Sequence, residues 1–152
     1  MLFGESGALL RPLSRRLAAF AWCLAGVGLA CGLAVAVGSG VRLSPSMQAV
    51  QATGLAGTGA SALFLVLAIW TQPGRARRPA TEQGETDGQA RSFLLAAVVM
   101  LVAVAGFAAA GWVSPTGPSP QSIAFSQIFL LGAVDCGLTF LLLNKVRTPE
   151  ER

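Results

Sequence analysis

The chain has 152 residues, of which 53% are hydrophobic and only 12% are charged. A soluble domain carries about 25% charged residues, so roughly half of the expected charge is missing. The mean hydropathy of +0.63 agrees with this shortage and argues against a soluble domain with an ordinary apolar core. The composition therefore favours a membrane protein.

Four stretches are apolar and long enough to cross the hydrocarbon layer, which takes about 20 helical residues. They cover residues 17–38, 53–70, 93–113 and 124–143. Period-2 alternation is absent from them, so helices, which pair every backbone group internally, are the expected structure in lipid. The sequence predicts an all-α polytopic membrane protein of one domain, a bundle of four transmembrane helices arranged as two antiparallel helical hairpins.

The first span, 17–38, has an alternative interpretation as a signal peptide. Three arginines precede it, and Ala34-Val35-Ala36 resembles a small-residue cleavage site. The apolar part of a signal peptide is about 7–15 residues long, whereas this run is longer. A retained transmembrane helix is therefore the preferred interpretation.

Lys and Arg gather in alternate connecting segments. Before the first span, between the second and third, and after the fourth, they are Arg11, Arg15, Arg16, Arg75, Arg77, Arg78, Arg91, Lys145, Arg147 and Arg152. Only Arg42 falls in the remaining connections. Cytoplasmic loops collect Lys and Arg, so the sequence predicts that both termini and the middle connection are cytoplasmic.

The middle connection, 71–92, mixes Pro, Gly, Gln and both signs of charge, and it lacks the apolar residues of a core. We expect a flexible basic cytoplasmic loop there. Its basic run lacks the interleaved aromatic residues on which nucleic-acid bases stack, so nucleic acid is not an expected partner. The layout is similar to that of many small bacterial and plastid membrane families. The expected location is the plasma membrane of a bacterium, with a thylakoid or plastid membrane as the alternative.

Small residues recur at helical spacing within the spans. Gly28 and Gly32 form a GxxxG motif in the first span, and the second and fourth spans carry Gly57 and Gly132 in similar rows. Lipid tails are as apolar as leucine, so transmembrane helices associate through close backbone approach instead of hydrophobic burial. We expect these glycines to pack the helices of the bundle together; the alternative is a surface that docks another subunit.

The residues needed for common catalytic and metal chemistry are scarce. The chain has no His, which removes the usual haem, zinc and copper ligand and the usual general base. Cys23, Cys31 and Cys136 all fall within apolar spans, where free cysteine behaves as a small apolar residue. We expect no catalytic residue, no metal site and no cofactor.

Asp135 is the single carboxylate within the four spans and lies near the middle of the last one. A central Asp costs about 2.5–3.5 kcal/mol on insertion scales, so such a residue normally faces protein or water. Thr139 shares its helical face. The nearest cation in sequence, Lys145, lies about 15 Å further along the helix axis.

Four kinds of partner for this carboxylate remain open. They are a bound proton, hydroxyl groups such as those of Thr58, Ser61 or Thr139, a bound cation, and a basic residue of another protein. Gln127 lies nearer the outer end of the same span and would extend a polar track. The first two partners make the residue structural, the third makes it a transport site, and the fourth makes it an assembly contact.

The favoured function is that of a small non-enzymatic integral membrane protein. It would act as an accessory or assembly subunit that interacts, within the lipid bilayer, with other membrane proteins or with further copies of itself. The alternative is a small permease or channel-like transporter of a proton, cation or small solute, with Asp135 as its working group.

Overall fold

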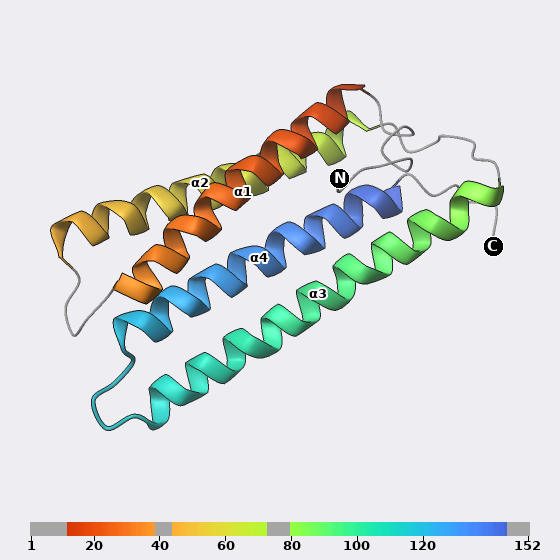
Figure 1. Cartoon of the computed structure of the whole chain (residues 1–152). Coiled ribbons are helices and arrows are strands. Elements are labelled where there is room, and N and C mark those ends of the chain that lie inside the picture. The colour runs from red at the N-terminus through yellow and green to blue at the C-terminus, as the bar shows by residue number, and fades with distance from the viewer. Residues whose placement is uncertain (1–11, 39–43, 73–79, 146–152) are drawn as a thin grey trace.

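A computed structural model describes residues 12–38, 44–72 and 80–145 of the chain. The described part is all-α, and Figure 1 shows its helices as α1 (Pro12–Gly38), α2 (Pro45–Thr71), α3 (Ala80–Val113) and α4 (Pro120–Lys145). All four are long and apolar enough to cross a membrane. The predicted fold class, an all-α chain with four helices capable of spanning a membrane, is confirmed.

Two of the helices begin at the same Ser-Pro signal. The hydroxyl oxygen of Ser44 accepts a hydrogen bond from the backbone N–H three residues later at 3.3 Å, and that of Ser119 does the same at 3.1 Å. Each serine satisfies an N–H group that lacks a partner within the helix. The proline that follows each serine gives up no helical hydrogen bond at this position. α2 and α4 therefore start before the apolar windows that predicted them.

The connection between the second and third spans differs from the prediction of a flexible loop over 71–92. α2 runs to Thr71 and α3 already begins at Ala80, while residues 73–79 lie outside the described part of the chain. A lack of apolar residues argues against a packed core, but it does not prevent a helix. Good helix formers (two Ala, two Glu, two Gln and one Arg) fill seven of the 13 positions of the segment 80–92, and extending an existing helix avoids the cost of nucleation.

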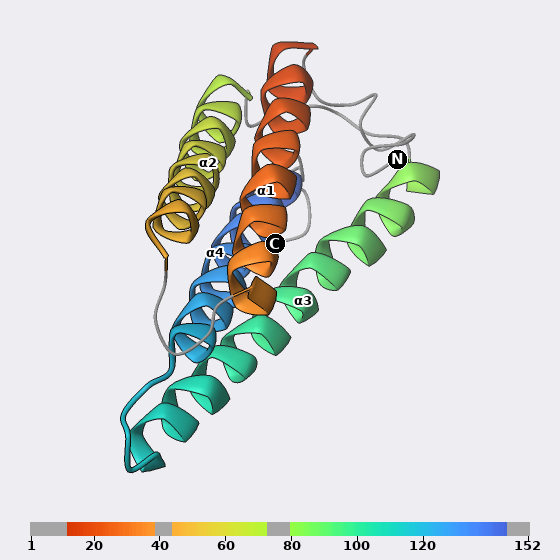
Figure 2. The ribbon, with the colours of Figure 1, turned by 60° about the vertical axis from the view of Figure 1, so that its left-hand side comes forward.

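The helices form two antiparallel hairpins, and α4 lies between the first hairpin and α3 (Figures 1 and 2). α1 packs along α2, α3 packs along α4, and α4 also contacts both α1 and α2. α3 packs mainly on α4. In the most apolar window of each helix, 44% of residues are buried in α4 but only 6% in α3. α4 is thus the central helix, and α3 lies at the edge.

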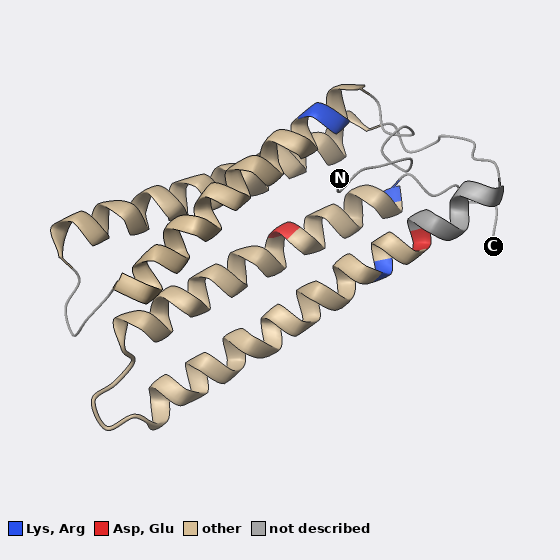
Figure 3. Cartoon of the chain, viewed as in Figure 1, with Lys and Arg blue, Asp and Glu red and all other residues tan. Residues whose placement is uncertain are grey.

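The described Lys and Arg residues lie at one end of the bundle (Figure 3). Arg15 and Arg16 are near the start of α1, Arg91 is in the first part of α3, and Lys145 ends α4. The ammonium group of Lys145 donates to the backbone carbonyl of Ile69 near the end of α2, which ties the two helices together at this end. The other predicted topology determinants lie outside the described residues.

We expect the end of the bundle that carries these charges to face the cytoplasm, because Lys and Arg are retained on that side. In a variant without native cysteines, an impermeant thiol reagent applied to intact cells should label Thr116→Cys, which lies in the exposed α3–α4 connection. Gln83→Cys should react only after the cells are permeabilised. Labelling of Gln83→Cys but not Thr116→Cys in intact cells would reverse the orientation.

Candidate functional site

Asp135 lies in the interior, on the part of α4 that faces the first hairpin, and is only 2% exposed. Its Oδ2 atom accepts a hydrogen bond of 2.8 Å from the hydroxyl of Ser61 on α2. Ser61 is fully buried, and its hydroxyl also lies 2.7 Å from the carbonyl oxygen of Thr58. The carboxylate therefore joins α4 to α2 inside the bundle.

The other carboxylate oxygen has no such contact. Asp135 Oδ1 is buried and accepts no hydrogen bond from any described residue. Lys145 is engaged with the carbonyl of Ile69 at the end of the bundle. Within the described ranges, the carboxylate thus has one hydroxyl partner and one unoccupied acceptor position.

Thr139 connects the same position to the first helix. Its hydroxyl donates to the backbone carbonyl of Asp135 at 2.8 Å and accepts from the indole N–H of Trp22 at 3.2 Å. The series Trp22, Thr139, Asp135 and Ser61 therefore crosses from α1 through α4 to α2. Sequence reasoning did not include Trp22 in the site; the signal available was its indole N–H, which needs an acceptor at that depth.

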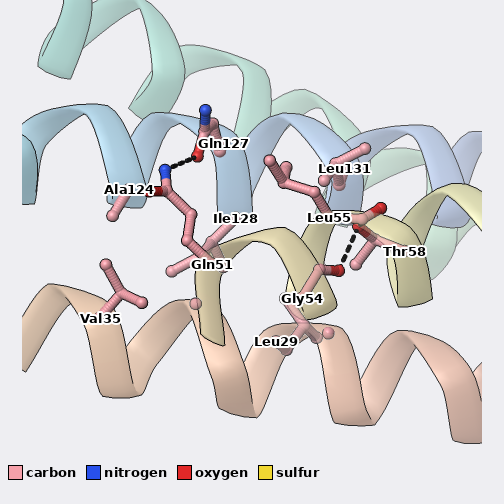
Figure 4. A pocket seen from close by; sticks show the side chains of 12 residues that line it. Leu29, Val35, Gln51, Gly54, Leu55, Thr58, Ala124, Gln127, Ile128 and Leu131 are labelled. Carbon is pink, nitrogen blue, oxygen red and sulfur yellow. Dashed lines mark hydrogen bonds between the residues drawn. The ribbon is translucent and has the colours of Figure 1, made fainter. Parts of the chain in front are cut away.

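The third predicted hydroxyl serves its own helix. Thr58 Oγ1 donates to the carbonyl oxygen of Gly54 at 2.9 Å, the bond drawn on the α2 ribbon in Figure 4. Of the hydroxyls expected near the carboxylate, the structure thus places Ser61 on its side chain, Thr139 on its backbone and Thr58 one turn away along α2.

Gln127 lies on α4 between Asp135 and the end of the bundle that is opposite Lys145. Its side chain pairs with that of Gln51, an amide that the sequence did not single out. Gln51 Nε2 of α2 donates to Gln127 Oε1 at 2.8 Å (Figure 4). Beside this pair is a cavity of about 20 Å³ between α1, α2 and α4, lined in part by Gly54 and Thr58. A space of this size holds about one water molecule.

Glycines bring α1 and α2 into backbone contact. A Cβ atom added at Gly28 would lie 2.9 Å from the carbonyl oxygen of Gly54 and would overlap the side chain of Thr58. One added at Gly57 would lie 3.4 Å from the carbonyl oxygen of Leu24. A Cβ added at Gly54, a glycine that the sequence did not single out, would lie 2.9 Å from the Cβ of Cys31.

Two further glycines receive side chains at α4. A Cβ at Gly32 of α1 would overlap the side chain of Ile128, and one at Gly132 of α4 would lie 2.7 Å from the sulfur of Met100 on α3. The four glycines expected at helix contacts are therefore distributed over the α1–α2, α1–α4 and α3–α4 interfaces. This placement fits intramolecular packing.

The described residues also include the candidates for metal and thiol chemistry. They contain no group of three or more His, Cys, Asp and Glu side chains arranged to hold a metal ion. Cys23 is exposed, Cys31 is half-buried, Cys136 is buried, and all three are free thiols.

Comparison of the chain with known protein families, with characterised proteins and with solved structures finds no match. The class of protein therefore follows from the fold and the interior polar contacts. Four apolar helices, each able to cross a membrane, are compatible with a small multi-pass integral membrane protein whose surface suits lipid.

Proposed function

We propose that the protein is a non-enzymatic accessory or assembly subunit that docks another membrane protein through α3. The exposure of α3 carries this proposal. Only 6% of its most apolar window is buried, against 28% in α1 and in α2. A helix that contributes so little to its own bundle has most of its surface available to lipid or to a partner.

The composition of one exposed face of α3 favours a protein partner over lipid alone. Ala105, Gly106, Ala109 and Ala110 are exposed and share this face over two turns. Small residues let helix backbones approach closely, which is the main source of helix association in lipid. Contact with lipid alone does not require small residues, because large apolar side chains face lipid equally well. Asp135 is not the docking contact in this proposal, because its side-chain partner Ser61 comes from the same chain. The proposal therefore places the contact with the partner protein on α3.

A photo-activated cross-linking amino acid at Ala109 should yield a discrete protein adduct in native membranes. The same amino acid at Leu63, which is 68% exposed on α2, should yield no protein adduct. Gly106→Leu should weaken the Ala109 adduct, because a bulky side chain would hold the partner away.

Three outcomes would contradict the accessory role. They are lipid adducts alone at both positions, an Ala109 adduct that Gly106→Leu leaves unchanged, and an adduct that consists only of two copies of this chain. The last would assign the face to self-association.

A second candidate function is a small permease or channel-like transporter of a proton, cation or small solute. The observation in its favour is Asp135 Oδ1, a buried acceptor with no partner among the described residues. The Gln51–Gln127 pair and its adjoining cavity supply further polar groups between the same helices. Replacement of Asp135 separates the two functions and is treated in the Discussion.

A further inference from the structure

A second, larger cavity lies between α3 and α4, close to the connection that joins them. Its volume is about 620 Å³ and it is open on one side. This volume is within the range of about 300–1,000 Å³ that is typical of small-molecule sites. It is separate from Asp135, which does not line it.

The walls of this cavity are apolar and aromatic. Val104, Phe107 and Trp112 contribute from α3, and Ile123 and Leu130 from α4. Phe107 is held in place by stacking on Phe125 of α4, with ring centroids 5.4 Å apart. These walls suit an alkyl chain.

The polar groups of the cavity are uncharged. No Lys, Arg, Asp or Glu is among the described residues that line it. The hydroxyl of Ser126 makes no hydrogen bond to a described residue, while that of Ser122 donates to the carbonyl of Ser119 at 2.8 Å. Gln127 uses its oxygen to accept from Gln51, and its amide nitrogen is turned away from that residue (Figure 4). Ser126 and Gln127 thus offer donors to a ligand.

The depth of these donors restricts the ligand further. Trp112 is 92% exposed near the end of α3, the position of an aromatic anchor at the level of the lipid headgroups. Ser126 lies about 9 Å along α4 from its first residue, Pro120, at a rise of about 1.5 Å per residue. A charged headgroup is costly to bring to that depth, whereas a hydroxyl or ester group that gains a hydrogen bond is not.

We propose that this cavity binds an uncharged single-chain amphiphile of the monoacylglycerol type. Its alkyl chain lies against Val104 and Phe107, and its ester carbonyl accepts hydrogen bonds from Ser126 and Gln127. A fatty-acid carboxylate is not the preferred ligand, because none of the described residues that line the cavity carries a cation to pair with it. This site is independent of the docking face on α3.

The test uses the full chain in phosphatidylcholine nanodiscs, titrated with a monoacylglycerol that is brominated on its chain. Bromine quenches nearby tryptophan fluorescence, and the difference between the parent and Trp112→Phe isolates the signal of Trp112. We expect saturable quenching. Ala108→Phe, which fills the cavity, should weaken binding at least tenfold. Ala56→Phe, an exposed alanine on α2 away from the cavity, should bind as the parent does.

Ser126→Ala removes one donor with little change in volume and should weaken binding about threefold or more, as loss of a single hydrogen bond does. It also keeps the test decisive if Ala108→Phe fails to fold. Equal quenching by brominated phosphatidylcholine would show an adventitious bilayer lipid only. Brominated oleate binding more tightly than the ester, or parent-like binding by Ser126→Ala, would also overturn the proposal.

Discussion

Gly28→Ala is expected to lower the free energy of unfolding by about 1–3 kcal/mol, the cost of overpacking a well-packed site. The new methyl group would lie 2.9 Å from the carbonyl oxygen of Gly54 and 3.1 Å from the backbone nitrogen of Thr58. Backbone atoms of a packed helix cannot turn aside, so α1 and α2 must separate. Unfolding in mixed micelles, followed by circular dichroism as a denaturing detergent is added, measures the change.

Two other glycines of α1 provide matched controls. A Cβ at Gly26 would meet nothing within 4 Å, so Gly26→Ala should be neutral or slightly stabilising, since alanine is the better helix former. At Gly32 the obstruction is the side chain of Ile128, which can change rotamer, so Gly32→Ala should fall between the two. Equal effects at Gly26 and Gly28 would show that the α1–α2 contact is looser than the structure has it.

The four helices could be predicted from the sequence because length and hydropathy decide whether a segment can cross a membrane. Which faces pack together could not, because lipid and helix interior are both apolar. Leu63 is 68% exposed and Leu65 is fully buried, yet both are leucines of the same span. The most apolar window of α3 has the highest mean hydropathy, 2.7, which agrees with its edge position. α2 and α4 share a value of 1.8, so hydropathy does not mark α4 as the central helix, and only the small residues point to contacts.

The candidate site could be predicted in part for the same reason. Asp135 stands out as the one carboxylate of an apolar span, and Thr139 follows from the helical repeat. Choosing Ser61 over Thr58 as its partner requires the rotation of α2 against α4, which no single sequence records. Gln51 and Trp22 come from other helices, and only the fold brings them to Gln127 and Thr139.

Asp135→Leu is expected to destabilise the protein by about 1–3 kcal/mol, because it puts a bulkier side chain into a packed site. It also removes the acceptor for Ser61, which is 2.8 Å away. Asp135→Asn keeps the shape and an acceptor oxygen, so it should accumulate and unfold as the parent does. Detergent unfolding and the membrane level of each variant measure both expectations.

The asparagine variant also separates the proposed functions. If the carboxylate serves only the packing of its own chain, Asp135→Asn should be stable and keep its partner. If it binds a transported proton or cation, the variant should be well folded but inactive when transport is assayed in liposomes. If it pairs with a basic residue of another subunit, the variant should lose that subunit, since breaking a buried ion pair costs about 3–5 kcal/mol.

A double-mutant cycle between Ser61 and Asp135 tests most directly whether the carboxylate acts within its own chain. Ser61→Ala, Asp135→Ala and the double variant are compared with the parent in detergent unfolding, so that losses common to both substitutions cancel. The hydrogen bond between these side chains predicts a coupling free energy of about 0.6–1.7 kcal/mol, as found for such bonds in membrane proteins. A coupling free energy of zero, with Asp135→Leu as stable as the parent, would contradict a structural role for Asp135.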